Sequence, residues 1–347
     1  MFALSELESV LPVVRAAVSP TPQYAWPLLK ARTGVDVWVK HENHTPIGTF
    51  KVRGGLVYFD RLKREATVQG VISATRGNHG QSLAFAGQRL GLPVTIVVPL
   101  GNSTEKNASM RALGAELIEH GRDFDAAKQH AVDIAAARGL NFAPTFHRDL
   151  VLGVATFAYE LFTSVPHLDT VYVPIGLGSA ICGVIATRDA LGLKTEVIGV
   201  VSDRANAYQQ SVKAGRLVCT DSALTFADGI AVRVPDATAF EVVRRGASRI
   251  VAVSDSEIAD AIRIMFSDTH STTEGAGAAS LAALIKERGR LKGRRVAVIA
   301  TGQNIDRRWM AKILAGGIPE IQTYLRMPGS TEADAAAPTP VAAAARK

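Results

Sequence analysis

Short apolar runs alternate with amphipathic segments along most of the chain, and this alternation occurs in two series. In the first series the pattern predicts strands at 35–40, 71–73, 94–98 and 115–118, and glycine-terminated helices at 82–90, 103–113 and 123–138. In the second series we expect helices ending near 190 and spanning 255–266 and 277–288, with strands at 170–173, 197–201, 251–253 and 296–300. Alternating units of this size favour parallel strands under covering helices. The pattern therefore predicts an α/β protein with two open, mostly parallel twisted sheets covered by helices.

The amino-acid composition indicates which kinds of molecule the protein binds. The chain has 347 residues, of which 47% are hydrophobic and 20% charged, as in ordinary globular proteins. Its formal charge of +7 is spread along the chain, which favours anionic small molecules and argues against nucleic acid. No apolar run approaches the ~20 residues that span a bilayer, and the first residues do not resemble a signal peptide. We expect a cytoplasmic protein that binds neither nucleic acid nor membrane, and no metal at its two distant cysteines, Cys182 and Cys219.

The stretch from Thr45 to Gly55 places Lys51 at the start of a predicted helix, directly after Phe50. A lysine close to the positive end of a helix dipole and packed by an aromatic ring loses its proton more easily than a solvated one. It then becomes a nucleophile toward carbonyl groups, as a Schiff-base lysine requires. The alternative is a solvated lysine that opens a basic helix together with Arg53 and Arg64.

Ligands of open α/β sheets bind where strands end at their carboxyl side, and the first such loop follows the strand at 71–73. It reads Thr75-Arg76-Gly77-Asn78-His79-Gly80-Gln81. Its small residues let backbone N–H groups face an anion, and the Asn78 amide can donate to a phenolate-type oxygen. The alternative is a capped helix start in which His79 is structural.

The second loop follows the strand at 170–173 and opens a helix, which is the geometry of a phosphate cradle. Its central residues are Gly176, Leu177, Gly178, Ser179 and Ala180. The loop could instead be half of a dinucleotide fingerprint, with Ile181 where the third glycine should stand and Asp203 as the ribose acid. An NAD-dependent oxidoreductase is therefore the alternative from another functional class.

The third loop, residues 300–304, ends an apolar strand and contains Thr301. The hydroxyl of Thr301 could hydrogen-bond an unprotonated ring nitrogen, although a capping threonine in a strand-end turn fits the local sequence equally well. Together, an imine-forming lysine, an anion-binding loop, an amide donor and a hydroxyl at successive strand ends suit pyridoxal 5'-phosphate.

From about residue 22 to 318 the chain resembles the threonine/serine dehydratase group of the fold-type II pyridoxal-phosphate enzymes, the tryptophan synthase β family. Thr49-Phe50-Lys51-Val52-Arg53-Gly54 is similar to the signature Ser-Phe-Lys-x-Arg-Gly, and this implies that Lys51 carries the cofactor and acts as base, with Phe50 beside it. Thr75-Arg76-Gly77-Asn78-His79 resembles Ser-x-Gly-Asn-His, which implies a substrate site in which Asn78 also reaches the cofactor.

Two further segments extend the resemblance. Residues 176–180 align with a tetraglycine phosphate loop in which Leu177 and Ser179 replace glycines, and Thr301-Gly302-Gln303-Asn304 looks like Ser-Gly-Gly-Asn, with Thr301 as partner of the pyridine nitrogen. Asp228 to Val232 also resembles a family segment that lines the site.

Two departures modify what the resemblance implies. Val201-Ser202 stands where many relatives have a Glu-Pro pair, so we expect the divalent-metal site to be lost. Arg76 stands where serine racemases have a second serine, which argues against racemisation. Two roles stay open for Arg76: it binds a second acidic group of the substrate, or it pairs with a surface carboxylate.

The resemblance implies β-elimination from a β-hydroxy amino acid, L-threonine or L-serine, giving a 2-oxo acid and ammonia. Alternatives within the family are phenylserine, 3-hydroxyaspartate and an intermediate of hydroxyectoine breakdown. We expect a homodimer or higher homo-oligomer, without the regulatory domain through which isoleucine feedback acts. We expect residues 1–47 and 149–326 to form a large cofactor-binding domain, 48–148 a small domain, and 327–347 a disordered tail.

Overall fold

The computed structural model describes residues 1–65 and 67–321, so the expected tail at 327–347 lies outside the described residues. The described strands form a six-stranded sheet of order β1-β2-β10-β7-β8-β9 and a four-stranded sheet of order β5-β4-β3-β6. Every neighbouring pair is parallel except β1 with β2. The prediction of two open, mostly parallel sheets is confirmed.

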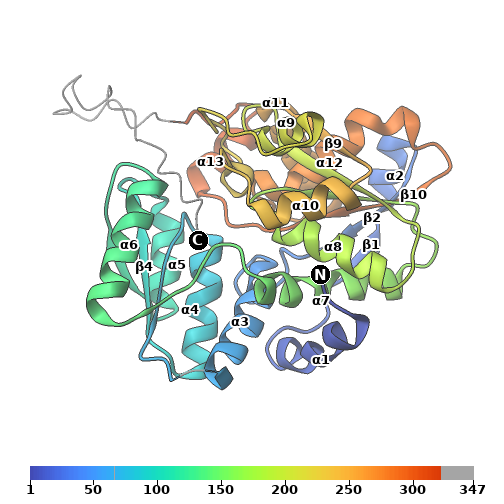
Figure 1. The fold of residues 1–347 in the computed structure, drawn as a ribbon. Helices are drawn as coiled ribbons and strands as arrows, with labels where there is room; N and C mark the ends of the chain where they lie inside the picture. Colours follow the sequence, from blue (N-terminus) through green and yellow to red (C-terminus); the bar gives the residue numbers. More distant parts are fainter. Residues whose placement is uncertain (66, 322–347) are drawn as a thin grey trace.

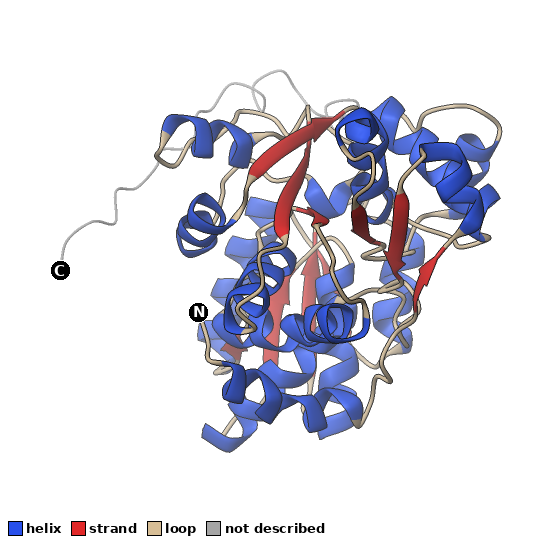
Figure 2. Ribbon diagram, turned by 90° about the vertical axis from the view of Figure 1, so that its right-hand side faces the viewer, coloured by secondary structure: helices blue, strands red, loops and turns tan. Residues whose placement is uncertain are grey.

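The sheets are built from short strands with helices between them. The strands are β1 (Gln23–Ala25), β2 (Asp36–Lys40), β3 (Val71–Ala74), β4 (Val94–Val98), β5 (Glu116–Glu119), β6 (Asn141–Phe142), β7 (Thr170–Pro174), β8 (Glu196–Ser202), β9 (Arg249–Val253) and β10 (Arg295–Ile299). The helices are α1 (Leu4–Arg15), α2 (Pro27–Thr33), α3 (Lys51–Glu65), α4 (Asn78–Leu90), α5 (Thr104–Ala112), α6 (Phe124–Arg138), α7 (Arg148–Ser164), α8 (Ser179–Ala190), α9 (Ala207–Ala214), α10 (Ala237–Gly246), α11 (Asp255–Thr269), α12 (Gly275–Glu287) and α13 (Arg307–Leu314). Central strands such as β3, β4 and β7 are buried along their whole length, because helices cover both faces of each sheet (Figure 2). Strands covered on both faces read as continuous apolar runs, which is why the sequence identified them.

Two helices connect the halves of the molecule. Helix α3 packs against α4 and α7, and α7 packs against α8. In Figure 1, α4, α5 and α6 surround β4 on one side, α8 to α12 lie with β9 and β10 on the other, and α3 and α7 lie between them. The lysine-bearing helix α3 therefore sits at the junction of the two sheets.

Two differences from the expected elements matter for the site. Helix α4 begins at Asn78, not at residue 82, so the polar residues assigned to a loop form the first helical turn. A first turn needs no apolar residues, because its N–H groups have no intrahelical partners and can face a ligand. Helix α7 was missed because it is apolar on nearly all sides, which removes the helical periodicity of a half-exposed helix.

Within the described ranges, no helix is both long enough and apolar enough to span a lipid bilayer.

Candidate active site

The lysine motif and the third loop are joined by backbone contacts. Helix α3 begins at Lys51, and the residue before it, Phe50, donates its N–H to the carbonyl oxygen of Thr301 at 3.0 Å. The hydroxyl of Thr49 donates to the same carbonyl at 3.1 Å. Thr49 also forms an isolated antiparallel bridge with Gly302. Lys51 is thereby held at the carboxyl end of β10, where strand-end loops were expected to carry chemistry.

The amine of Lys51 has the properties of a nucleophile. Its Nζ lies 5.0 Å from the centroid of the Phe50 ring, and it makes no hydrogen bond or ion pair with another described residue. Burial lowers the pKa of Lys51 to about 8, and the carboxylate of Glu274 partly opposes this shift. A larger fraction of neutral amine is then present near neutral pH than for a solvated lysine, so the amine can attack a carbonyl carbon.

Asn78 connects the first loop to the third. Its Nδ2 donates to Oε1 of Glu274 at 2.6 Å, and its Oδ1 accepts from Nδ2 of Asn304 at 2.9 Å. The preceding loop is closed by the hydroxyl of Thr75, which accepts from the N–H of Gly77 at 3.1 Å. The structure therefore brings together residues that the sequence placed on two different strand ends, and it fixes the plane of the Asn78 amide.

His79 is buried directly behind Asn78. Burial lowers the pKa of His79 to about 3, the positive charge of Lys51 adds to this effect, and a hydrogen bond to the backbone of Pro144 opposes it. Its Nε2 has no hydrogen-bond partner among the described residues. The imidazole is therefore neutral at physiological pH, with one ring nitrogen directed to the backbone and the other free.

The second loop forms an anion cradle at the start of α8. Gly178 has φ of 109°, a conformation that favours glycine, and a Cβ on Gly176 would lie 2.3 Å from the carbonyl oxygen of Gly229. Within the described chain, none of the backbone N–H groups of residues 177–181 donates to a protein acceptor. The carbonyl of Leu177 accepts from the hydroxyl of Tyr208 at 2.9 Å, which fixes the loop. Free N–H groups at the positive end of a helix bind phosphate well.

Thr301 is buried at the end of β10, and its hydroxyl forms no hydrogen bond with another described residue. Its neighbour Gly302 is required by space, because a Cβ there would lie 2.5 Å from Oε1 of Glu274. The Thr301 hydroxyl is thus available to a ligand held beside the lysine.

A buried charged group that the sequence did not reveal completes the site. Nζ of Lys106 lies 2.5 Å from Oδ2 of Asp228 and 3.5 Å from Oε2 of Glu274. Burial raises the pKa of Glu274 to about 7, although the charge of Lys106 acts in the opposite direction. In the sequence, Lys106 resembles one of several charged residues of an exposed helix, and Glu274 stands alone in a polar stretch. The one sequence signal for Glu274 was its position directly before an apolar, Gly- and Ala-rich helix.

Arg53 also differs from the expectation. The interpretation in which it belongs to an exposed basic face is wrong, because its guanidinium is fully buried and paired with Glu42 and Glu160. Arg64 does lie on the exposed face of α3, in an ion pair with Asp60. The pairing partners of Arg53 come from the end of β2 and from α7, which periodicity along α3 cannot indicate.

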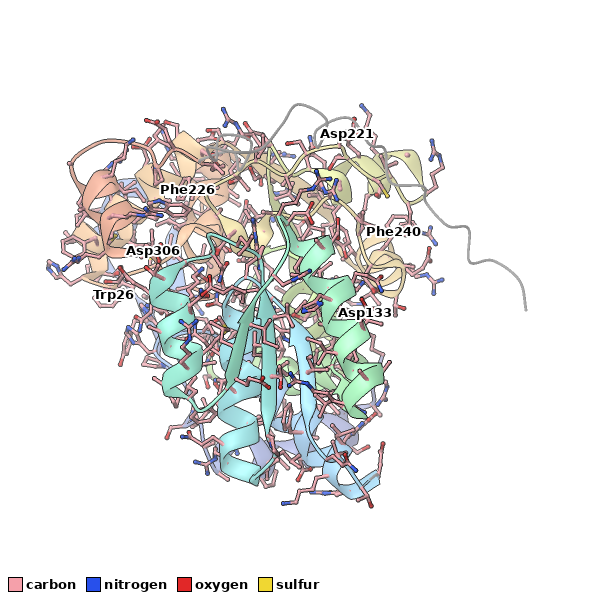
Figure 3. The ribbon with its side chains drawn as sticks, turned by 90° about the vertical axis from the view of Figure 1, so that its left-hand side faces the viewer. Trp26, Asp133, Asp221, Phe226, Phe240 and Asp306 are labelled. Atoms are coloured by element: carbon pink, nitrogen blue, oxygen red, sulfur yellow. The ribbon has the colours of Figure 1, made fainter. Side chains whose placement is uncertain are left out.

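A cavity of about 940 Å³ opens beside these groups. Its lining includes Arg76, Lys106, Asp228, Glu274 and Asn304. Figure 3 shows two further lining residues, Phe226 and Asp306, on the same side of the molecule, above the cyan and green elements of the smaller sheet. The cavity therefore lies between the two sheets.

The candidate ribose-binding acid of the NAD-dependent alternative lies away from the cavity. Asp203, the candidate ribose acid, is exposed at the end of β8 and does not line the cavity. Among the residues the structure describes, no group of three or more His, Cys, Asp or Glu side chains is arranged to hold a metal ion.

The free groups of the site match the polar groups of pyridoxal phosphate. The unpaired Lys51 amine suits the aldehyde, the N–H groups of residues 177–181 suit the phosphate, and the Thr301 hydroxyl suits the pyridine nitrogen. Each of these protein groups is free in the described chain, so the residues present fit this cofactor.

Comparisons with known proteins agree with this fit. A family model described as Pyridoxal-phosphate dependent enzyme matches residues 14–302. The L-threonine ammonia-lyase of Thermotoga maritima is 33% identical over 319 residues, 92% of this chain and 79% of that protein. The L-threonine ammonia-lyase of Geobacter sulfurreducens is 35% identical over 298 residues, 85% of this chain and 74% of that protein.

Solved structures give the same result for the fold. Threonine deaminase isoform 2 from Solanum lycopersicum, in its processed form, is similar with a TM-score of 0.83 and 29% identity, covering 91% of this chain and 95% of that one. A maize serine racemase has a TM-score of 0.84 at 23% identity over 90% of this chain and 97% of that one, a likeness of fold alone. With the family model covering most of its length, the chain belongs to the pyridoxal-phosphate dependent enzymes of fold type II.

Proposed function

We propose that the chain removes water from a β-hydroxy amino acid, L-threonine or L-serine, and releases a 2-oxo acid and ammonia. The observation that supports this most strongly is the amine of Lys51 at the start of α3, which has no hydrogen-bond or ion-pair partner among the described residues and whose pKa is lowered by burial. The names of the relatives from Thermotoga maritima and Geobacter sulfurreducens point to the same reaction. Bound pyridoxal phosphate would supply an electron sink for the negative charge that develops on the substrate Cα.

In this proposal Lys51 has two roles. Its amine would hold the aldehyde group of bound pyridoxal phosphate, and when it is free again the neutral amine would accept the Cα proton of the substrate. A pKa of about 8 suits a general base that works near neutral pH. The aromatic ring of Phe50 keeps water from one side of the amine and limits its motion.

The remaining loops would bind and orient the cofactor and the substrate. The N–H groups of residues 177–181 would hold the cofactor phosphate, and the Thr301 hydroxyl would donate a hydrogen bond to the ring nitrogen. A hydroxyl partner would leave that nitrogen unprotonated, so the bound cofactor would stabilise less negative charge than it would with a carboxylate partner. At the start of α4, the backbone N–H groups of Asn78 and His79 donate to no acceptor in the described chain and would bind the α-carboxylate, and Asn78 would also orient the cofactor.

The proposal has several further parts that follow from the family resemblance. The enzyme lacks the divalent-metal site at 201–202 and does not racemise its substrate. It is a cytoplasmic homo-oligomer, with residues 1–47 and 149–326 as the cofactor domain and 48–148 as the small domain.

A release assay for 2-oxo acid tests the proposal. Purified protein with pyridoxal phosphate is given L-threonine, L-serine, phenylserine, 3-hydroxyaspartate and hydroxylated intermediates of hydroxyectoine breakdown. We expect release from at least one of them, and loss of both the release and the visible absorbance of bound cofactor in Lys51→Ala. A Lys51→Ala protein that keeps both would refute the role of Lys51. Absence of cofactor absorbance in the wild type would favour the NAD-dependent alternative.

A further inference from the structure

Arg76, in the loop before α4, is a cation without a partner among the described residues. It follows Thr75, precedes Gly77, lines the 940 Å³ cavity and is only partly exposed. It forms no ion pair with any acidic side chain of the described chain. The alternative in which Arg76 pairs with a surface carboxylate therefore finds no partner among the described residues.

The acidic groups around the cavity are engaged elsewhere. Each of the four described acidic residues that line it has a partner: Asp228 binds Lys106, Glu274 accepts from Asn78, Asp306 accepts from Ser103, and Glu320 binds Lys312. Arg308, the other lining arginine, is exposed to solvent. Among the described residues that line the cavity, Arg76 is thus the partly buried arginine whose N–H donors are free to bind a ligand.

A guanidinium presents five N–H donors in a planar arrangement that matches a carboxylate with two parallel hydrogen bonds. Under the proposed function, backbone N–H groups at the start of α4 bind the α-carboxylate of the substrate. The guanidinium of Arg76 is then left to bind a second anionic group. A cavity of about 940 Å³ has room for a side chain longer than that of threonine.

We propose that Arg76 is a specificity-determining residue that binds a carboxylate on the substrate side chain, so that the preferred substrate is an acidic β-hydroxy amino acid such as 3-hydroxyaspartate. This inference rests on the proposed elimination of water from a β-hydroxy amino acid, and it narrows the preferred substrate from L-threonine or L-serine to one with a second carboxylate.

The test compares kcat/KM for L-threonine and for 3-hydroxyaspartate in wild type, Arg76→Gln and Arg76→Lys. Loss of a charge-assisted pair lowers kcat/KM for the diacid about 10- to 100-fold in Arg76→Gln, while the value for threonine changes less than about threefold. Arg76→Lys keeps the charge but not the paired geometry, so it recovers part of the loss. Arg111→Gln, an equal change of net charge at an exposed pair with Glu119, leaves both values unchanged.

Two outcomes would overturn the inference. An equal loss for both substrates in Arg76→Gln would show that Arg76 serves the α-carboxylate, and no loss for either would show that it serves no carboxylate. In either case turnover of threonine would leave the proposed function standing.

A binding measurement separates this inference from the reaction itself. Malate and lactate are both 2-hydroxy acids without an amino group. Malate carries a second carboxylate and lactate does not. We expect malate to raise the melting temperature of the holoenzyme more than lactate does, and this difference to disappear in Arg76→Gln. Equal shifts by the two acids in wild type would contradict the assignment, whether or not any amino acid is turned over.

Discussion

Replacing Arg53 with methionine is expected to destabilise the fold by about 3–5 kcal/mol, because it leaves buried charge without compensation. In the structure Nε of Arg53 lies 2.8 Å from Oε2 of Glu42 and Nη1 lies 2.7 Å from Oε1 of Glu160. Lys40 joins the same group, 2.7 Å from Glu160. The charges of the two cations and two carboxylates therefore sum to zero. Without the guanidinium, one lysine faces two carboxylates in a buried site.

The size of this loss depends on pH in a defined direction. Burial raises the pKa of Glu160, but Arg53 and Lys40 outweigh burial and hold it below the ordinary value. Without Arg53 we expect the folded-state pKa of Glu160 to rise above its unfolded value. The folded variant then keeps a proton that the unfolded chain releases, so its stability falls as pH rises through this window. The gap to wild type should be smaller near pH ~5 than near pH ~8.

Urea unfolding followed by tryptophan fluorescence measures the effect. Arg64→Met is the matched control, because Arg64 lies on the same helix in an exposed pair with Asp60 and should change stability by no more than about 0.5 kcal/mol. Adding Glu160→Gln to Arg53→Met removes the one excess negative charge, leaving Lys40 with Glu42, and should restore part of the loss. If Arg53→Met unfolded within about 1 kcal/mol of the Arg64→Met control at neutral pH, the buried-charge argument would be wrong.

Three further expectations concern the site. Because burial lowers the pKa of Lys51 to about 8, protein freed of cofactor should gain visible absorbance from added pyridoxal phosphate at a rate that rises most steeply near pH 8; a rise centred near the ordinary lysine value would contradict the burial argument. Gly176→Ala places a Cβ 2.3 Å from the carbonyl oxygen of Gly229 and should weaken cofactor binding at least about tenfold by fluorescence titration, whereas Gly289→Ala, with no atom within 4 Å of the new Cβ, should leave it unchanged. Burial raises the pKa of Glu274 to about 7, so the folded state holds an extra proton and wild-type stability falls as pH rises from about 4.5 to 7; Glu274→Gln should flatten this part of the profile, and an unchanged slope would exclude Glu274 as its source.

The candidate site could be found from sequence where each residue stands at a strand end. Asn78 and Thr301 follow closely after buried strands whose apolar runs are plain in the sequence, and the carboxyl ends of parallel strands are where ligands bind. The glycine loop at 176–180 was identifiable for the same reason. Lys51 was found from its own motif, at the start of the helix that comes after the strand ending at Lys40. What the pattern could not supply was the start of α4, because polar residues and glycines serve equally in a loop and in a first helical turn.

The contacts that could not be predicted join residues far apart in the chain. Arg53 and its partner Glu160 are 107 residues apart, and Asn78 and Glu274 are 196 apart. Along a single helix or loop each of these side chains resembles a solvated charge or a capping group. Their roles arise only from tertiary packing, which brings α3 against α7 and the start of α4 against the start of α12.

These long-range contacts give the site its defining property, which is that no single segment contains it. Phe50 donates to the carbonyl of Thr301, and Asn78 bonds to both Glu274 and Asn304, so the lysine helix, the start of α4 and the loop after β10 are tied into one hydrogen-bonded unit. The smaller sheet contributes Asn78, while the larger contributes the other partners. Folding of either sheet alone would leave Glu274 and Asn78 without each other, and buried polar groups without partners are costly. Burial is what lowers the pKa of Lys51, and α3 packs against α4 of the smaller sheet and against α7 between the sheets, so we expect the reactive state of the lysine to depend on the assembly of both sheets.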